Sequence, residues 1–417
     1  MMENKLLVVS SYPEKGSVHG AGTVGIASYT KNTLLNILKA AKSSGSGLKL
    51  TVLAEKLGKG SESEYYENGL EVKRIWKRSS LLSYLSIIAA CLKSDAGKIL
   101  VEFEVSMFGG PIYLLLFPMF LRVLSMLGKQ VYFIPHQIIV DINELSGHIG
   151  ITQNSFSSKF FNILIRMFFN LSVKSSYRTI VFEDDFRKLF DIKLQEKITV
   201  IPHGVEAIKP ALSYQSAREK LGIKKETVLL YFGFIAWYKG VDWIAEKIVN
   251  SDVKLIIAGG TNPNHRDKPY YMEYVKKIDE LALSSKGRIV VTGFVGEEKI
   301  SLYYQAADLV VFPYRTFMSS SGPLAMAFTY GKPVILSEAI SGYMNTADFQ
   351  KAMEKARLTS EDMFFPLSDY SWEKKLKNPD LKIMDKLKVF SNLMREKRDF
   401  GKIGRRYYEY IFKNEQI

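Results

Sequence analysis

The sequence predicts an α/β protein with two doubly wound parallel-sheet domains that face each other across a cleft. Short apolar runs typical of strands alternate with segments of helical periodicity, a pattern that favours parallel sheets covered by helices. The alternation stops at a polar stretch near residues 206–216 and then starts again. A ligand is expected between the two domains, at the carboxyl ends of the strands.

The expected strands fall into two series with helical segments between them, among them an aromatic-rich helix at 156–173. The first series is 6–10, 48–53, 99–103, 130–134, 179–182 and 198–201. The second series is 228–232, 254–258, 288–292, 309–312 and 333–336. We therefore expect one domain at 1–205 and a second domain at 206–383. Basic, aromatic helices at 384–417 are expected to pack back on the first domain.

The composition limits the class of protein. The formal net charge is +14 over 417 residues, which favours anionic partners. The one cysteine, Cys91, excludes an intramolecular disulfide and fits a reducing compartment, and its apolar helical surroundings predict a buried position. The N-terminus runs directly into a strand without an apolar signal segment, so a cytoplasmic location is expected.

A very apolar segment at 107–129 raises the question of a membrane. It contains Pro111, Pro118 and Arg122, and its uncharged run is shorter than the roughly 20 residues that a spanning helix needs. We expect a buried helix of the first domain here. A face that docks on a membrane surface is the alternative that the basic surplus supports.

The stretch "GAGTVG" places Gly20, Gly22 and Gly25 in the spacing of a dinucleotide fingerprint. That fingerprint needs a strand directly before the first glycine, whereas about ten residues separate Val9 from Gly20. The loop suits an anionic or polyhydroxy ligand better than NAD. A nucleotide-dependent dehydrogenase remains the alternative.

In the second half, Gly233 follows a strand and Lys239 precedes a helix, where an ammonium can neutralise a diphosphate. The alternative is a solvated surface lysine. In the turn after the 288–292 strand, Phe294 and Val295 are placed to face a nucleobase. Alternatively, Phe294 packs on its own helix.

The segment "SSSGPLAMAF" predicts a helix whose N-cap is Ser321. Hydroxyls of Ser320 and Ser321 and the N–H groups of Gly322 and Leu324 offer an anion and sugar site. A capped core helix without a ligand is the alternative.

Three polar residues follow or lie in the strands of the first half. His136 is either a structural histidine or a site residue. Glu102 and Glu104 lie on one face of a strand, where one could line the cleft and at least one is expected to be solvated.

The motifs "IPHGV", "FGF…YKGVD", "IIAGG", "VTGFV", "YYQAADLVVFPY" and "SSSGPLAMAFTYGKPVI", in this order, resemble the C-terminal half of retaining glycosyltransferases of family 4 (group 1), which have the GT-B fold. Upstream, "GIASYTKNTL", "VEFEVSMFGG" and "VYFIPHQ" resemble segments of that family's acceptor domain. The resemblance covers nearly the whole chain.

The resemblance implies roles for these residues. Lys239 would bind the donor diphosphate and, with His136 near the donor sugar, would carry catalysis. The remaining donor contacts would come from the following residues: Gly20, Gly22, Gly25, Gly233, Phe294, Val295, Ser320, Ser321, Gly322 and Leu324. A UDP- or GDP-linked sugar would be the donor, with no metal and no cofactor.

The sequence departs from the family at its pair of glutamates, where Met318 and Met326 stand, and at an arginine, where Phe234 stands. Arg315 is a possible substitute for the missing arginine.

The expected function is a retaining hexosyltransferase that acts on a glycan hydroxyl. Its acceptor would be a lipid-linked or cell-surface glycan precursor, and the enzyme could associate with the cytoplasmic membrane face. The alternative is a catalytically impaired relative that serves as a binding or scaffold protein. Nucleic acid is not an expected partner, because the basic residues are dispersed and no zinc or helix-turn-helix pattern occurs.

Overall fold

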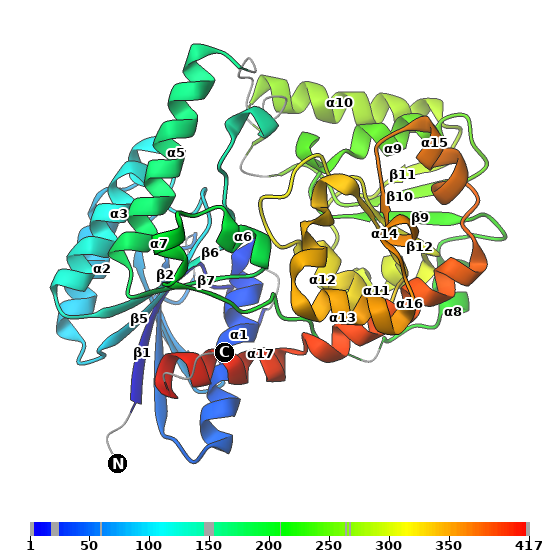
Figure 1. The fold of residues 1–417 in the computed structure, drawn as a ribbon. Coiled ribbons are helices and arrows are strands. Elements are labelled where there is room, and N and C mark those ends of the chain that lie inside the picture. Colours follow the sequence, from blue (N-terminus) through cyan, green and yellow to red (C-terminus); the bar gives the residue numbers. More distant parts are fainter. Residues whose placement is uncertain are drawn as a thin grey trace.

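The protein is seen in a computed structural model that describes residues 4–17, 25–58, 61–145, 154–208, 210–262, 265–266 and 268–413. Two parallel sheets, each between layers of helices, form two domains that lie side by side (Figure 1). This is the predicted α/β architecture.

The first domain contains, in chain order, β1 (Asn4–Val9), α1 (Ile26–Ser43), β2 (Leu48–Glu55), β3 (Glu64–Glu67), β4 (Leu70–Trp76), α2 (Leu82–Lys93), β5 (Lys98–Phe103), α3 (Pro111–Met126), β6 (Gln130–Pro135), η1 (Ile142–Leu145), α5 (Phe156–Ser175), β7 (Arg178–Val181), α6 (Asp184–Lys188), α7 (Ile192–Gln195) and β8 (Ile198–Val200). The strand order is β3-β4-β2-β1-β5-β6-β7-β8, and only β3 runs antiparallel to its neighbour. Leu7 and Val9 enter one core and Leu6 and Val8 the other, because helices cover both faces of the sheet.

The second domain contains α8 (Tyr214–Lys220), β9 (Val228–Phe232), η2 (Trp237–Lys239), α9 (Val241–Ile248), β10 (Lys254–Ala258), α10 (Pro269–Ser284), β11 (Ile289–Val291), α11 (Glu297–Ala306), β12 (Leu309–Phe312), α12 (Gly322–Thr329), β13 (Val334–Ser337), η3 (Glu338–Asn345), α13 (Ala347–Ala356), α14 (Ser360–Met363), β14 (Phe364–Phe365), α15 (Asp369–Ser371), η4 (Trp372–Leu376) and α16 (Leu381–Lys397). Its strand order is β11-β10-β9-β12-β13-β14. The order reverses between β9 and β12, where an open parallel sheet leaves a crevice at its carboxyl edge.

The chain ends with α17 (Phe400–Tyr408) and η5 (Glu409–Lys413), which return to the first domain (Figure 1). Helix α16 packs on α12 and α13, whereas α17 packs on α1. The buried hydroxyls of Tyr29 and Tyr407 are 3.0 Å apart, and a Cβ on Gly404 would lie 2.5 Å from the backbone carbon of Asn36. The predicted helix that crosses back is therefore confirmed. The domain boundaries at 205/206 and 383/384 stay predictions.

The apolar segment at 107–129 forms α3, with Pro118 inside the helix. Its inner side chains Phe117 and Leu121 are buried, but Leu115 and Met119 are more than half exposed. The expectation of a buried helix thus holds for one face of α3 only. No helix in the described part of the chain is long and apolar enough to cross a membrane. Cys91 is buried, as expected, and burial raises the pKa of its thiol to about 12.

Candidate functional site

Lys239 lies beside Gly233, at the carboxyl edge of the second sheet. A Cβ on Gly233 would lie 3.3 Å from Nζ of Lys239 and 3.2 Å from Cγ of Pro323, in the first turn of α12. Gly233 has φ +114°, a conformation that favours glycine. The structure therefore brings together three of the predicted elements: the glycine after β9, the lysine of η2 and the start of α12.

The Lys239 ammonium is a cation for which the described part of the chain supplies no counter-charge. Burial lowers the pKa of Lys239 to about 8, and no carboxylate in the described residues pairs with it. Its nearest ring contacts are Tyr238 and Tyr314, whose centroids lie 5.9 and 6.0 Å from Nζ. An anion that reached this lysine would favour its charged form and raise its pKa, against the effect of burial.

Arg315 does not take the place of the missing arginine as a free cation. Its guanidinium forms two hydrogen bonds with the Asp242 carboxylate, at 2.8 and 2.9 Å, and a third with the Trp237 carbonyl oxygen at 2.5 Å. These bonds use three of the five guanidinium N–H groups, and the substitute role of Arg315 stays a prediction. Arg315 instead braces the turn that carries Lys239.

Ser321 caps α12 as predicted. Its hydroxyl accepts a hydrogen bond from the Leu324 N–H at 3.3 Å and lies 3.0 Å from the Tyr314 hydroxyl. The Ser321 N–H donates to the Tyr343 hydroxyl at 2.9 Å. Because Leu324 is capped and Pro323 has no N–H, the Gly322 N–H is the group of this turn left for a ligand.

The Ser320 side chain contacts a buried ionic network that was not predicted from the sequence. Its hydroxyl donates to Glu183 of the first domain at 3.0 Å. Glu183 receives two hydrogen bonds from Arg398, at 2.7 and 3.0 Å, and Arg398 also bonds Asp348. The Ser320 hydroxyl therefore joins the two domains in this conformation, and its predicted donor contact stays untested.

Glycines let the loops at this sheet edge touch through their backbones. A Cβ on Gly259 would lie 1.9 Å from the Gly233 carbonyl oxygen, and one on Gly260 would lie 3.1 Å from the Phe294 nitrogen. Phe294 is 61% exposed, so it does not pack on its own helix. Phe294 and Val295 follow Gly293 in the turn predicted to face a nucleobase, and that role is still a prediction.

In the first domain, His136 follows β6 and is held by a buried carboxylate. Its Nε2 lies 3.0 Å from Oε2 of Glu102, which also accepts a hydrogen bond from the Thr30 hydroxyl at 2.9 Å. The His136 ring meets Tyr29 and Phe182 edge-on, with both centroids 4.9 Å away. With Nε2 directed to Glu102, Nδ1 is the ring nitrogen left for another partner.

Glu104 is the second carboxylate of this strand end. Its Oε1 accepts from the Ser106 hydroxyl at 3.0 Å, and its buried Oε2 has no hydrogen-bond partner in the described residues. Burial raises the pKa of Glu104, and Glu104 in turn adds to the raised pKa of Tyr238, after burial and Tyr314. The expectation of a solvated face is wrong for Glu102, which is fully buried because β5 is a central strand covered on both sides. Glu104 follows β5 and is partly exposed.

The predicted glycine loop is only partly described. Gly20 and Gly22 lie outside the described residues. Gly25 directly precedes α1, and a Cβ there would lie 3.9 Å from Oε2 of Glu104.

Both methionines at the family's glutamate positions lie in apolar surroundings. Met318 is 8% exposed, and its carbonyl oxygen accepts the Ile138 N–H across the domains at 2.8 Å. Met326 packs half-buried on the core of the second domain. Neither side chain can supply the carboxylate that the family's glutamates carry.

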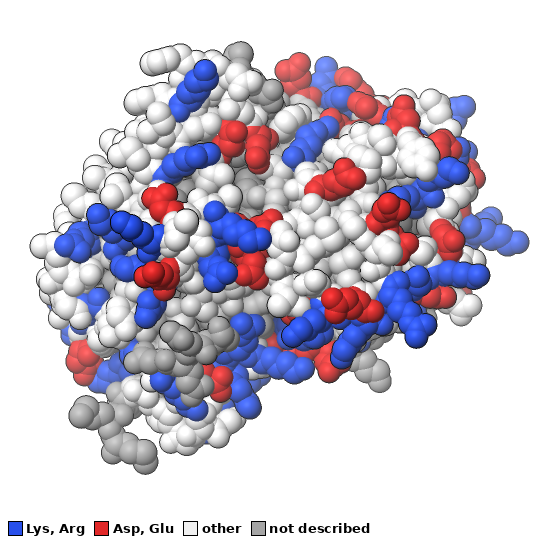
Figure 2. Space-filling model, in the orientation of Figure 1, with Lys and Arg blue, Asp and Glu red and all other residues white. Residues whose placement is uncertain are grey.

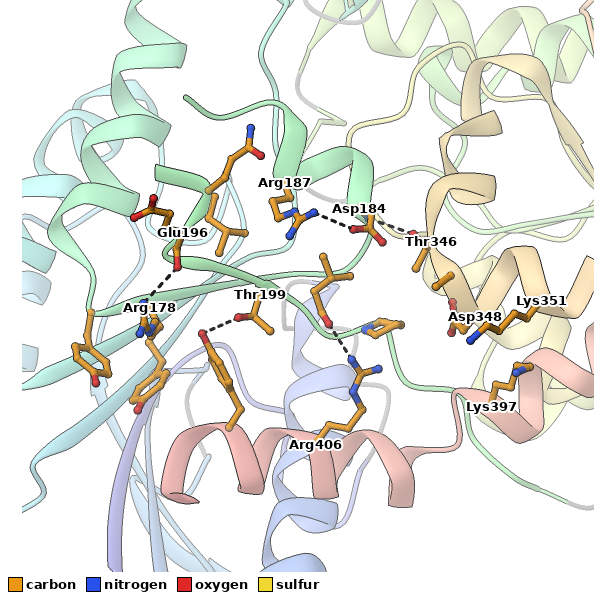
Figure 3. A pocket seen from close by; sticks show the side chains of 18 residues that line it. Arg178, Asp184, Arg187, Glu196, Thr199, Thr346, Asp348, Lys351, Lys397 and Arg406 are labelled. Atoms are coloured by element: carbon orange, nitrogen blue, oxygen red, sulfur yellow. Dashed lines mark hydrogen bonds and ion pairs between the residues drawn. The ribbon is translucent and has the colours of Figure 1, made fainter. Parts of the chain in front are cut away.

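A hollow of about 810 Å³ lies elsewhere, between β8, α13 and α17 (Figure 3). Basic side chains reach it from both domains, and Arg406 donates to the Val200 carbonyl oxygen at 3.0 Å. Asp348 lines the hollow and bonds Arg398. None of the predicted donor or catalytic residues lines it. Among the described residues, no cluster of three or more His, Cys, Asp or Glu could hold a metal ion.

Comparisons with known proteins agree with this architecture. Residues 226–352 match the family described as glycosyl transferases group 1. The lipopolysaccharide 1,2-N-acetylglucosaminetransferase of Salmonella typhimurium is 25% identical over 205 residues, which cover 42% of this chain and 53% of the relative. The chain thus spans about half the length of that relative.

Solved structures align over the whole chain. HepE of Anabaena in complex with UDP-glucose has a TM-score of 0.63 at 14% identity, covering 99% of this chain and 100% of that one. Sucrose-phosphate synthase of Thermosynechococcus elongatus has a TM-score of 0.63 at 15% identity, covering 98% and 95%. The chain therefore has the GT-B fold, and residues 226–352 are similar to the group 1 glycosyltransferases.

Proposed function

We propose that this protein is a glycosyltransferase that uses a nucleotide-sugar donor, UDP- or GDP-linked. The observation that carries the proposal is the unpaired, half-buried Lys239 beside Gly233 and the start of α12. When the bond between the sugar and the diphosphate breaks, negative charge grows on the leaving diphosphate. A desolvated ammonium and the Gly322 N–H at a helix start would stabilise that charge.

His136 supplies the first domain's part of the proposal. In the tautomer with its proton on Nε2, His136 donates to Glu102, and Nδ1 can accept a hydrogen bond from a sugar hydroxyl. The proposed role is to orient the donor sugar. The likeness to HepE, which was solved with UDP-glucose, favours a UDP-linked hexose.

The finer proposal is a retaining transfer to a glycan hydroxyl on a lipid-linked or cell-surface precursor, at the cytoplasmic membrane face. The group 1 family match and the lipopolysaccharide-modifying relative support it. Retention would be measured by proton NMR on the fresh product. An anomeric coupling that matches the donor agrees with the proposal, and the opposite coupling overturns it.

The first experiment is a thermal-shift screen with UDP, GDP, ADP and their common sugar conjugates, with NAD as the comparison. A ligand at about one hundred times its Kd stabilises the fold by about 2.7 kcal/mol. Lys239→Ala should lose the shift. The matched control is Lys276→Ala, since Lys276 is an exposed lysine of the same domain.

Three outcomes separate the possibilities. A shift with sugar nucleotides that requires Lys239, together with transfer to an acceptor, agrees with the proposal. A shift without transfer or donor hydrolysis would favour a scaffold protein that has lost catalysis with its two glutamates. No shift with any sugar nucleotide, for folded protein, would overturn the donor site.

A further inference from the structure

The outer face of the first domain is covered by α2, α3 and α5, which pack side by side on the sheet (Figure 1). Each of these helices exposes large apolar side chains on the side away from the core. We call this surface the three-helix face. It comprises Leu82, Leu85, Leu92, Ile112, Leu115, Met119, Met126, Phe156, Phe160, Ile163, Met167 and Leu171.

The exposed side chains of α5 follow the helical repeat. Phe156, Phe160, Ile163, Met167 and Leu171 are spaced by three or four residues, so they form one stripe along the outside of the helix. Phe156 is 89% exposed and Ile163 is 58% exposed. A surface helix that faced only water would carry polar residues in this stripe.

A second stripe lies on α3. Ile112, Leu115, Met119 and Met126 are exposed at the same helical spacing, with Arg122 between them. The opposite side of α3 is buried in the core, so apart from Arg122 both sides of this helix are largely apolar. Contiguous exposed apolar surface of this kind marks a site of interaction.

The charges of the three helices all have one sign. The sequences of α2, α3 and α5 contain no aspartate or glutamate, and their charged residues are Lys93, Arg122, Lys159, Arg166 and Lys174. Two carboxylates outside the three helices contact α5: Asp141 accepts a hydrogen bond from Asn162 at 2.7 Å, and Asp191 accepts one from Asn170 at 3.2 Å. In Figure 2 the surface over the free end of α5 is white with blue basic side chains.

We propose that the three-helix face lies on an anionic lipid bilayer, with its apolar stripes in the headgroup and acyl boundary and its basic residues at the lipid phosphates. Apolar stripes would serve any hydrophobic partner, but basic residues without a single acid match an anionic lipid surface. The proposed docking is argued from the residues of the three-helix face alone. The idea that it brings the enzyme to a lipid-borne acceptor rests on the proposed function.

The test is flotation of the full-length protein with vesicles of phosphatidylcholine alone, or of phosphatidylcholine with phosphatidylglycerol. We expect the protein to float with the anionic vesicles and far less with the neutral ones, and added salt to weaken the binding. The triple variant Phe156→Ser, Phe160→Ser, Ile163→Ser should reduce partitioning at least about tenfold. Lys159→Glu with Lys174→Glu should reduce it at least about fivefold at low salt.

The matched control replaces three exposed apolar residues of the second domain: Leu283→Ser, Tyr370→Ser and Leu381→Ser. Their exposures, 84%, 69% and 79%, are like those of the α5 stripe. This control should float as the wild type does. Equal loss in the control, or full binding by the α5 variant, would overturn the proposal.

Three further measurements separate loss of docking from other effects. Circular dichroism and the nucleotide-induced thermal shift should be unchanged in the α5 variant, so loss of docking is separate from loss of folding or of donor binding. Sedimentation equilibrium tests a second copy as the occupant. The wild-type protein could self-associate without binding vesicles, while the α5 variant is monomeric. That result would overturn the lipid proposal and identify a second copy of this chain as the occupant of the three-helix face.

Discussion

Ser320 of the second domain donates a 3.0 Å hydrogen bond to Glu183 of the first domain. Ser320 lies just before α12, whose N-terminus belongs to the candidate donor site. Glu183 is fully buried and is paired with Arg398, which also bonds Asp348. This buried ionic network thus ties the start of α12 to the first domain, together with the bond from the Ile138 N–H to the Met318 carbonyl oxygen.

Breaking this network should destabilise the protein strongly. Arg398→Met should lower the free energy of unfolding by about 3–5 kcal/mol, because Glu183 would stay buried without a cation. Urea unfolding followed by circular dichroism measures the change. Lys276→Ala breaks the exposed pair with Glu280 and should cost less than about 1 kcal/mol. Equal costs for the two variants would contradict the role given to Arg398.

Nucleotide binding should depend on pH through Lys239. Since the pKa of Lys239 is lowered to about 8, the lysine is charged below that pH and loses its charge as the pH rises through it. The affinity for UDP should therefore fall above pH 8, as calorimetry can measure. Lys239→Arg should bind with a flatter pH dependence, because an arginine keeps its charge. A wild-type affinity that is constant from pH 7 to 9 would remove Lys239 from the site.

Gly233→Ala should weaken donor binding as well as stability. The new Cβ would press on Lys239 and Pro323 at 3.3 and 3.2 Å, on a backbone with φ +114°. Backbone strain of this kind costs about 1–3 kcal/mol. Gly287→Ala is the matched control, since Gly287 has φ +83° and no atom near its Cβ position. The control should lose stability and keep UDP affinity.

Restoring the family's glutamate should harm this chain rather than help it. Met318 is 8% exposed at the domain contact, so Met318→Glu would bury a carboxylate without a partner and lower the melting temperature. Met318→Leu conserves volume and should cost less than about 1.5 kcal/mol. A glutamate variant with raised activity and unchanged melting temperature would show that the site still accepts the family's contact.

The sequence predicted most of the fold because the central strands are apolar on both faces. Apolar runs predicted β1, β9 and the strands beside them, and helical spacing predicted the crossing helix α17. The hairpin β3–β4 was missed although Asn68-Gly69, both with positive φ, form a two-residue loop that signals one. β14 is two residues long and carries no periodicity.

For the candidate site, local chemistry was readable and long-range pairing was not. The N-cap at Ser321 and the place of Lys239 follow from their own segments. The bond from Ser320 to Glu183 joins residues 137 apart, and Arg398 reaches Glu183 over 215 residues. A single sequence carries no pattern that identifies partners so far apart along the chain. The burial of Glu102 was missed for a similar reason, since it depends on the helices packed over β5.

The packing of α17 on α1 also has a consequence for biosynthesis. The surface of α1 around Tyr29 is completed by Tyr407, near the end of the chain. During translation the first domain leaves the ribosome early, yet this part of its core is open until the second domain has been made. The first domain therefore keeps this part of its apolar core exposed while the second domain is synthesised, and a chaperone would bind it in that state.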